Sequence, residues 1–365
     1  MTCFIGCVLV LQWLLPCLTE SVSLQAAPPP ALPSYSITEI PMPSGAVSMQ
    51  ALSINTKDAV AGYYALAAGD VHGFVWSNNT LSTLPPLPGH SQTLARDISD
   101  GGVVVGYSGP TSSPDKAVVW TNGQPHSLGT LGGAWSAANG ISSSGQVVGW
   151  AMVEPGTTRF HGFLYDGSSL LDVGLMVGGV ATELNDINSS GMAVGNGQVI
   201  EGHFHAILVD REEGILDLGT LGGVTSEARA VSDAGHVVGG AQTGVRNDAT
   251  FEGIERHAFL WHKGKMTDLG TLPGLIESRA MGVNSSGQVV GIASSADVAT
   301  STAFLWRRGK MTALESLLPP GSGWTLRTAN AINESGTIVG EGLHDGQPRA
   351  FVMHPVMSAP VTGAR

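Results

Sequence analysis

The stretch that decides the fold runs His257-Ala-Phe-Leu-Trp-His-Lys-Gly-Lys-Met-Thr-Asp-Leu269 and, a few residues later, Ser278-Arg-Ala-Met-Gly-Val-Asn-Ser-Ser-Gly-Gln-Val-Val-Gly291. It contains four short runs of β-branched, aromatic and aliphatic residues, separated by residues that favour turns. In Asn284-Ser-Ser-Gly287 the Asn side chain can bond the backbone, and Gly at the fourth position accepts the left-handed conformation that ends a type I turn. The pattern is typical of four antiparallel β-strands.

The same pattern occurs seven times along the 365 residues. Each copy ends in a glycine that we call the closing glycine, with a β-branched residue eight positions earlier and Asn or Ser seven positions earlier. The closing glycines are Gly62, Gly106, Gly149, Gly195, Gly239, Gly291 and Gly340. Their spacings are 44, 43, 46, 44, 52 and 49 residues. Four strands in about 45 residues is the pattern of a β-propeller blade.

The two ends of the repeat are complementary. Tyr35-Ser-Ile-Thr-Glu-Ile40 precedes the first copy and matches the fourth strand of a unit, as in Met266-Thr-Asp-Leu269. The last copy stops after Phe351-Val-Met353 and lacks that fourth strand. We therefore predict an all-β fold, a seven-bladed β-propeller in which the N-terminal strand completes the last blade. Such pairing would leave no open sheet edge. The structural alternative is an open β-solenoid, which would require caps at its ends.

Composition and the first residues predict export. The net charge is −12, which gives no basic surface for nucleic acid. Cys3 to Leu18 is apolar, about the length of a signal-peptide core and short for a membrane span. We predict a signal peptide over residues 1–26, a Pro-rich spacer over 27–34, one propeller domain over 35–357 and a tail over 358–365. A lipid anchor at Cys17 is the alternative to release from the cell.

The motifs resemble the HAF repeat of bacterial extracellular repeat proteins. They stand here as His257-Ala-Phe-Leu-Trp261, Asp217-Leu-Gly-Thr-Leu-Gly-Gly223 and Asn284 to Gly291, and the resemblance covers roughly residues 35–354. The first, second and seventh copies lack the Asp-Leu-Gly-Thr-Leu run. The resemblance implies a secreted or surface location and supplies no catalytic residues.

Two series of polar residues recur in phase with the repeat. His72, His161, His205 and His257 precede the aromatic runs at equivalent positions, where other copies have Lys116, Thr302 and Arg349. Asp172, Asp217 and Asp268 recur in the fourth strand before a Gly turn. One side chain per blade is too widely spaced for a metal site or a catalytic pair, and a cation in the same series opposes a metal. We expect each His to bond a local turn or face solvent and each Asp to fix the Gly turn. We predict no catalytic residues, metal or cofactor.

Departures from the repeat are the better indicators of function, because recognition is usually added to a regular scaffold by its loops. The longest insertion, Gly240–Arg256, carries Arg246, Asp248, Glu252 and Glu255. Trp135 and Trp324 follow Gly corners where other copies have smaller residues, and an exposed Trp offers a rigid face to a sugar or peptide. The structural alternative is that both indoles cap a blade. We take these six residues as candidate binding residues.

The sequence favours a monomeric, non-enzymatic binding scaffold at the cell surface or outside it, with a glycan or protein ligand and no integral membrane span. The alternative is an extracellular lyase or hydrolase acting on polysaccharide, with residues from several blades meeting at the channel mouth. No nucleophile elbow, phosphate loop, zinc-binding HExxH or nucleotide fingerprint occurs in the chain.

Overall fold

The computed structural model describes residues 34–356, apart from 111–114, 201, 211–213, 248–253 and 297–298. The predicted signal peptide, Cys17, the spacer up to residue 33 and the tail at 358–365 lie outside the described residues. In the part of the chain that is described, no helix is long and apolar enough to cross a membrane.

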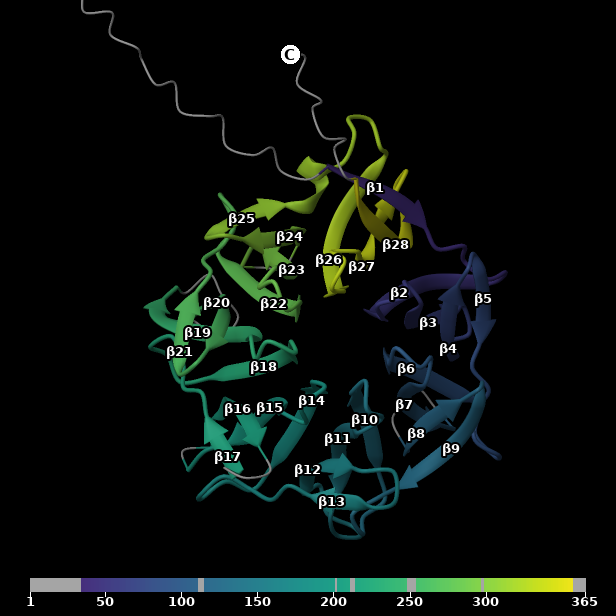
Figure 1. The fold of residues 1–365 in the computed structure, drawn as a ribbon, viewed down its shortest axis with the longest axis vertical. Helices are drawn as coiled ribbons and strands as arrows, with labels where there is room; N and C mark the ends of the chain where they lie inside the picture. Colours follow the sequence, from purple (N-terminus) through teal and green to yellow (C-terminus); the bar gives the residue numbers. More distant parts are fainter. Residues whose placement is uncertain are drawn as a thin grey trace, which may run out of the picture. The chain divides into compact units, whose positions relative to one another are not determined.

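The described strands form seven four-stranded antiparallel sheets around an axis, a seven-bladed β-propeller (Figure 1). Blades 1 to 3 consist of β2 (Ala46–Ile54), β3 (Val60–Leu66), β4 (Val71–Ser77), β5 (Thr80–Thr83); β6 (Gln92–Ile98), β7 (Val104–Gly109), β8 (Lys116–Thr121), β9 (Gln124–Gly129); and β10 (Ser136–Ile141), β11 (Val147–Met152), β12 (Phe160–Tyr165), β13 (Leu170–Asp172). Blades 4 to 6 consist of β14 (Thr182–Ile187), β15 (Ala193–Gln198), β16 (Phe204–Asp210), β17 (Gly214–Asp217); β18 (Ser226–Val231), β19 (Val237–Arg246), β20 (Ile254–His262), β21 (Lys265–Asp268); and β22 (Glu277–Val283), β23 (Val289–Ser294), β24 (Ser301–Arg307), β25 (Lys310–Ala313). Blade 7 consists of β26 (Trp324–Ile332), β27 (Ile338–His344), β28 (Gln347–Val356) and β1 (Ser34–Glu39).

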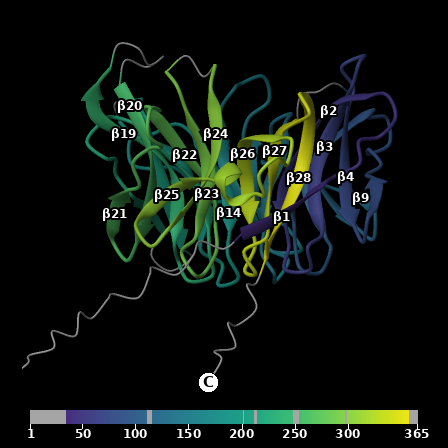
Figure 2. The ribbon, with the colours of Figure 1, turned by 90° about the horizontal axis from the view of Figure 1, so that it is seen from above.

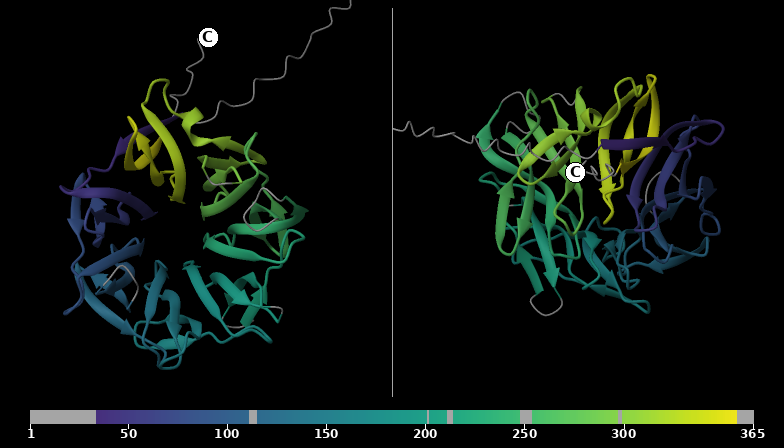
Figure 3. Two further views of the ribbon diagram at one scale, coloured as in Figure 1. Left: turned by 180° about the vertical axis from the view of Figure 1, so that it is seen from behind. Right: turned by 45° about the horizontal axis from the view of Figure 1, so that its top comes forward.

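The N-terminal strand closes the ring, as the two ends of the repeat predicted. β1 pairs antiparallel with β28, with Glu39 opposite Phe351, and the ring is closed when seen from either face (Figures 1 and 3). The amide N–H of Ile40 donates to the carbonyl of Ala350 at 3.0 Å, as Leu269 does to Ala258 at 2.9 Å in blade 5. The carboxylate of Glu39 is paired with Arg349 at 2.7 Å. The open β-solenoid is therefore excluded.

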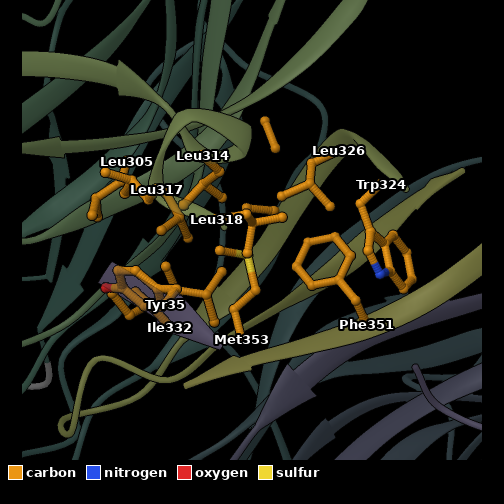
Figure 4. Packing of buried hydrophobic residues seen from close by; sticks show 14 residues of the cluster. Tyr35, Leu305, Leu314, Leu317, Leu318, Trp324, Leu326, Ile332, Phe351 and Met353 are labelled. Atoms are coloured by element: carbon orange, nitrogen blue, oxygen red, sulfur yellow. The ribbon is translucent and has the colours of Figure 1, made fainter. Parts of the chain in front are cut away.

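Apolar side chains pack between neighbouring blades rather than in one central core. Seven buried clusters fill the spaces between the sheets, and Figure 4 shows the one that joins blades 6 and 7. There Tyr35 of β1 is buried among Leu305 and Leu314 of the blade 6 side and Met353 of β28. Because both faces of most strands are covered, alternating positions are apolar on both sides, which explains the mixed apolar runs in the sequence.

The Asn-x-x-Gly turns link one blade to the next. In the turn of blade 6 the backbone N–H of Gln288 donates to Oδ1 of Asn284 at 3.1 Å, and Gly287 is left-handed with φ of 72°. Both features were predicted. The sequence did not predict that the amide of Asn284 also donates to the carbonyl of Asn333 in blade 7, at 3.1 Å. Asn333 in turn donates to Asn55 of blade 1 at 3.0 Å, so these bonds cross the joint where the ring closes.

A bulge recurs in the first strand of every blade and sets the geometry of the channel. The register shifts, for example, between Ala95 and Asp97 in β6. At each bulge a main-chain carbonyl points at the closing glycine of the second strand: a Cβ built on Gly106 would overlap the carbonyl oxygen of Leu94. The closing glycines are thus required by the close approach of the neighbouring strand.

Candidate ligand site at one mouth of the central channel

The first strand of each blade faces the axis. β2, β6, β10, β14, β18, β22 and β26 form the innermost ring in Figure 1, and residues from all seven line an axial cavity of about 210 Å³. Each of these strands runs toward its Asn-x-x-Gly turn, so residues early in the strand lie at the opposite end of the channel. The blades are seen edge-on in Figure 2, with the channel axis running along the strands.

Two positions of the repeat meet at this opposite end and differ from blade to blade. One is the residue that follows the closing glycine, in the second strand of the blade. The other lies in the first strand, four positions before the β-branched residue that the repeat places eight positions before the closing glycine. The two positions are opposite each other across the first two strands. Together with the arginines beside them they form a polar cluster that we call the arginine mouth. It consists of Tyr63, Arg96, Tyr107, Asn139, Trp150, Glu183, Asn196, Glu227, Arg229, Arg256, Arg279 and Glu341.

Blades 5 and 6 contribute the arginines around Glu227. The carboxylate of Glu227 is 2.9 Å from Arg229 and 2.6 Å from Nε of Arg279. Arg256 adds a third positive charge. Burial alone would raise the pKa of Glu227, but the three guanidinium groups outweigh it and hold the pKa below its ordinary value. One carboxylate thus neutralises part of a concentrated positive charge.

Glu183 of blade 4 has the opposite environment. Burial raises its pKa above the ordinary value, and this effect exceeds the attraction of Arg96 and the hydrogen bond from Asn139 at 3.1 Å. The charge of Glu227 adds to the rise. The arginine mouth therefore holds two glutamates with opposed pKa shifts.

Blades 1 to 3 supply aromatic rings. The guanidinium carbon of Arg96 lies 5.8 Å from the ring centroid of Tyr107, within cation–π range. Burial, the charge of Glu341 and the neighbouring Tyr107 raise the pKa of the Tyr63 phenol, while Arg96 lowers it. Trp150 meets Phe160 edge to face, with ring centroids 5.8 Å apart. One half of the arginine mouth is aromatic and the other half is charged.

Several buried polar atoms in the arginine mouth have no hydrogen-bond partner within the protein. They are Nε of Arg96, Nε of Arg229, Oδ1 of Asn139 and Oδ1 of Asn196. Native structures pair nearly all such atoms with protein or water, so a group of them at one place points to a site made for polar groups from outside the chain. The guanidinium groups offer N–H donors that suit a carboxylate, sulfate or phosphate.

Two aspartates, Asp97 and Asp186, line the same axial cavity as Arg96 and Arg229, and their carboxylates bond the main chain. Oδ2 of Asp97 accepts from the N–H of Ile141, and Oδ2 of Asp186 accepts from that of Val231, each at 2.8 Å and each across a blade joint. Burial, with the charge of Asp97, raises the pKa of Asp186 to about 7. Among the described residues, no three His, Cys, Asp or Glu side chains are grouped so as to hold a metal ion.

The recurrent His and Asp residues bond each other within a blade. Nδ1 of His257 lies 2.9 Å from Oδ2 of Asp268, and the other carboxylate oxygen accepts from the N–H of Gly270 at 2.7 Å. Equivalent pairs join His161 to Asp172 and His205 to Asp217. The prediction that Asp fixes the Gly turn is confirmed. The prediction that each His bonds a turn or faces solvent needs correction, because the His bonds the carboxylate that fixes the turn.

The four predicted binding residues that the structure describes, Trp135, Arg246, Glu255 and Trp324, are not brought together at the arginine mouth. Trp324 is only 5% exposed, so its ring is a core element, as the structural alternative had it. Trp135 is 49% exposed at the start of β10. The insertion extends the β19–β20 hairpin, where Glu255 accepts from Asn247 at 2.9 Å and Arg246 pairs with Ile254 across the strands. Asp248 and Glu252 lie outside the described residues. The insertion places Arg256, its last residue, in the arginine mouth.

The two tryptophans should respond differently to truncation. Trp324 stacks on His344 with ring centroids 4.6 Å apart and meets Phe351 edge to face, so Trp324→Ala should lower stability by about 3 kcal/mol. Trp135→Ala should change it by less than about 0.5 kcal/mol, because a surface side chain loses little packing. Denaturant titrations of both variants measure the difference. Equal effects would contradict the burial assigned to these rings.

One position of the repeat could have indicated the arginine mouth from sequence, because its residue differs between the copies. The residue after the closing glycine is Tyr, Tyr, Trp, Asn, Gly, Ile and Glu in the seven copies, whereas the closing glycine before it is the same in all seven. Positions that a repeat holds constant serve the scaffold, and an inward-facing position that varies is available for recognition.

Comparison with known proteins supports the fold. No family model matches the chain, and no curated protein matches it in sequence. An oligogalacturonate lyase in complex with manganese aligns with a TM-score of 0.53 and 9% identity, over 88% of this chain and 93% of its own. A streptogramin B lyase aligns with a TM-score of 0.50 and 8% identity, over 88% and 98%. A gluconolactonase from Xanthomonas campestris has a TM-score of 0.40 and 11% identity, over 88% and 89%. The likeness is one of fold alone.

Proposed function

We propose that the protein is a secreted or cell-surface binding scaffold that holds an acidic glycan at the arginine mouth. The observation that carries the proposal is the set of buried guanidinium nitrogens without a partner, on Arg96 and Arg229, at the edge of the axial cavity. Leaving such donors unpaired costs free energy, and a carboxylate or sulfate ester that accepts from them would recover it.

The charge distribution supports an anionic ligand. The chain carries 12 more acidic than basic residues, yet four of its twelve arginines gather in the arginine mouth. Three glutamates, Glu183, Glu227 and Glu341, offset part of that positive charge, and burial favours the neutral form of Glu183 and Glu341. In an acidic protein such a concentration attracts anions to one place rather than over the whole surface.

The aromatic half supports a sugar over a simple anion. Rings such as Tyr63 and Trp150 give flat apolar faces on which the C–H side of a pyranose can lie, and they lose little conformational entropy on binding. A ligand that spans the arginine mouth could place an acidic group on the arginines and a sugar ring on the aromatic side. We further propose that the chain is a member of the HAF-repeat family, which agrees with a location outside the cell.

Binding to immobilised acidic polysaccharides tests the proposal. Polygalacturonate, alginate and hyaluronan should retain the protein, neutral dextran should not, and retention should weaken as salt rises. Arg96→Gln should lower the affinity about 10- to 100-fold, since a hydrogen bond to a charged group contributes about 1.5–3 kcal/mol. Lys57→Gln removes one positive charge from the Asn-turn end of the channel and is the matched control.

Two results would contradict the proposal. One is equal retention on dextran and on the acidic polymers. The other is an Arg96→Gln variant that binds as tightly as Lys57→Gln while both variants keep the thermal stability of the unchanged protein.

A glycan-cleaving enzyme is the second candidate function. The observation that favours it is the pair Glu183 and Glu227, whose pKa values are shifted in opposite directions within one site. Two carboxyl groups separated in this way can act as general acid and base. Turnover of the same polymers, followed by reducing ends and ultraviolet absorbance, separates the two functions. Activity that is lost in Glu183→Gln while binding remains would favour the enzyme.

A further inference from the structure

A second cavity opens beside the arginine mouth. It has a volume of about 400 Å³ and lies among blades 3, 4 and 5. Phe160 at the start of β12 and Phe204 at the start of β16 give it aromatic walls, and it shares Glu183, Asn196 and Glu227 with the arginine mouth. Phe160 also contacts Trp150, so the aromatic half of the arginine mouth continues into this side pocket.

The polar groups of the side pocket suit hydroxyl groups. Oδ1 of Asn196 is buried without a partner, and it can accept a hydrogen bond from a ligand. Glu183, opposite Asn196 across the strands, offers a carboxyl group whose second oxygen can bond a hydroxyl. Apolar walls with a few convergent polar groups are the usual composition of a small-molecule pocket.

The charged groups that line the side pocket favour a neutral sugar over an acidic one. Two carboxyl groups, Glu183 and Glu227, border it. Its one arginine, Arg256, already donates to Oγ1 of Thr225 at 3.0 Å and helps to neutralise Glu227, and His203 is the other basic side chain in the lining. A neutral pyranose needs no countercharge here, whereas a uronic acid would share the pocket with two carboxyl groups.

We infer that the side pocket is a subsite for a neutral pyranose unit. This inference rests on the proposed function and deepens it, because it makes the ligand a heteropolysaccharide that carries acidic and neutral sugars. The acidic unit binds at the arginine mouth. The neutral unit stacks on Phe160 and Phe204 and gives a hydroxyl hydrogen to Asn196.

Saturation-transfer difference NMR with single sugars tests this assignment. The probes are methyl glucopyranoside, methyl galactopyranoside and methyl N-acetylglucosaminide as neutral sugars, and methyl glucuronoside as the acidic one. Phe204→Ser removes an aromatic wall of the side pocket and lies outside the arginine mouth. It should reduce the signal of the neutral probes at least fivefold and leave that of the glucuronoside. Arg96→Gln should do the reverse.

The outcomes separate this inference from the proposed function. Loss of neutral-sugar signal in Phe204→Ser, with the glucuronoside signal retained, supports the subsite. Glucuronoside signal that depends on Arg96, with no neutral sugar bound or with neutral binding unchanged in Phe204→Ser, overturns the subsite and leaves the arginine mouth. Absence of signal from all four probes contradicts both. Thermal unfolding of each variant checks that the fold is retained.

Discussion

Deletion of Tyr35 to Ile40 should produce the largest loss of stability of any short deletion in the chain. These residues make up most of β1, which supplies the fourth strand of blade 7. Tyr35 is 1% exposed and Ile40 fully buried, in the clusters on the two sides of that blade. Exposing two such side chains costs roughly 3–6 kcal/mol before the lost strand pairing is counted.

The deletion should also change the association state. Removing β1 leaves β28 with an unpaired edge. It also removes Glu39, the carboxylate that pairs with Arg349 and His344. Exposed strand edges pair with other chains. We expect a lower melting temperature and larger species on size-exclusion chromatography. An unchanged melt with an unchanged elution volume would contradict closure by β1.

A peptide in trans gives the matched control for that deletion. A synthetic Ser34–Pro41 peptide can add to the free edge of β28 as a strand and should restore part of the lost melting temperature. The same peptide with Tyr35→Ser and Ile40→Ser can form the same main-chain bonds but fills neither cluster. It should restore much less, so the pair of peptides separates strand pairing from burial.

Closure could be predicted from sequence because its signal is local. The match of Thr38-Glu-Ile40 to Thr267-Asp-Leu269 requires only that a fourth strand has a recognisable pattern. The structure extends the match, since Glu39 pairs with Arg349 as Asp268 pairs with His257. Both members of the pair differ between the two blades: blade 5 has His257 with Asp268, and blade 7 has Arg349 with Glu39. The pairing between the two series could not be predicted from sequence, because nothing in a single strand shows which residue of the next strand lies diagonally across from it.

The arginine mouth could not be predicted in the same way. Arg96 and Glu183 are 87 positions apart in the sequence, and only the curvature of the ring brings their blades close enough to interact.

The burial of a side chain is equally hard to predict from a single residue. Trp324 and Trp135 occupy comparable loops after a Gly corner, yet one stacks on His344 within a blade and the other faces solvent. Packing partners from other strands decide between the two.

Gly106→Ala should be the most damaging single substitution among these predictions. Gly106 lies in β7 with its backbone in an ordinary extended region, so the turn chemistry alone would tolerate alanine. The bulge in β6, however, puts the carbonyl oxygen of Leu94 where the new methyl group must go, with the Cα of Ala95 next to it. Both obstacles are main-chain atoms of a paired strand, and they cannot move aside without breaking the ladder of blade 2.

The expected cost is more than about 4 kcal/mol, which is exceptional for the addition of one methyl group. Gly101→Ala in the same blade is the matched control. Gly101 is exposed, and the nearest atom to its added Cβ is Oγ of Ser99 at 3.7 Å, an ordinary contact. It should change the free energy of unfolding by less than about 0.5 kcal/mol. Chemical denaturation of the two variants measures the difference. If Gly106→Ala unfolds at the same denaturant concentration as Gly101→Ala, the close approach of the neighbouring strand does not require the closing glycines, and their recurrence in all seven copies has another cause.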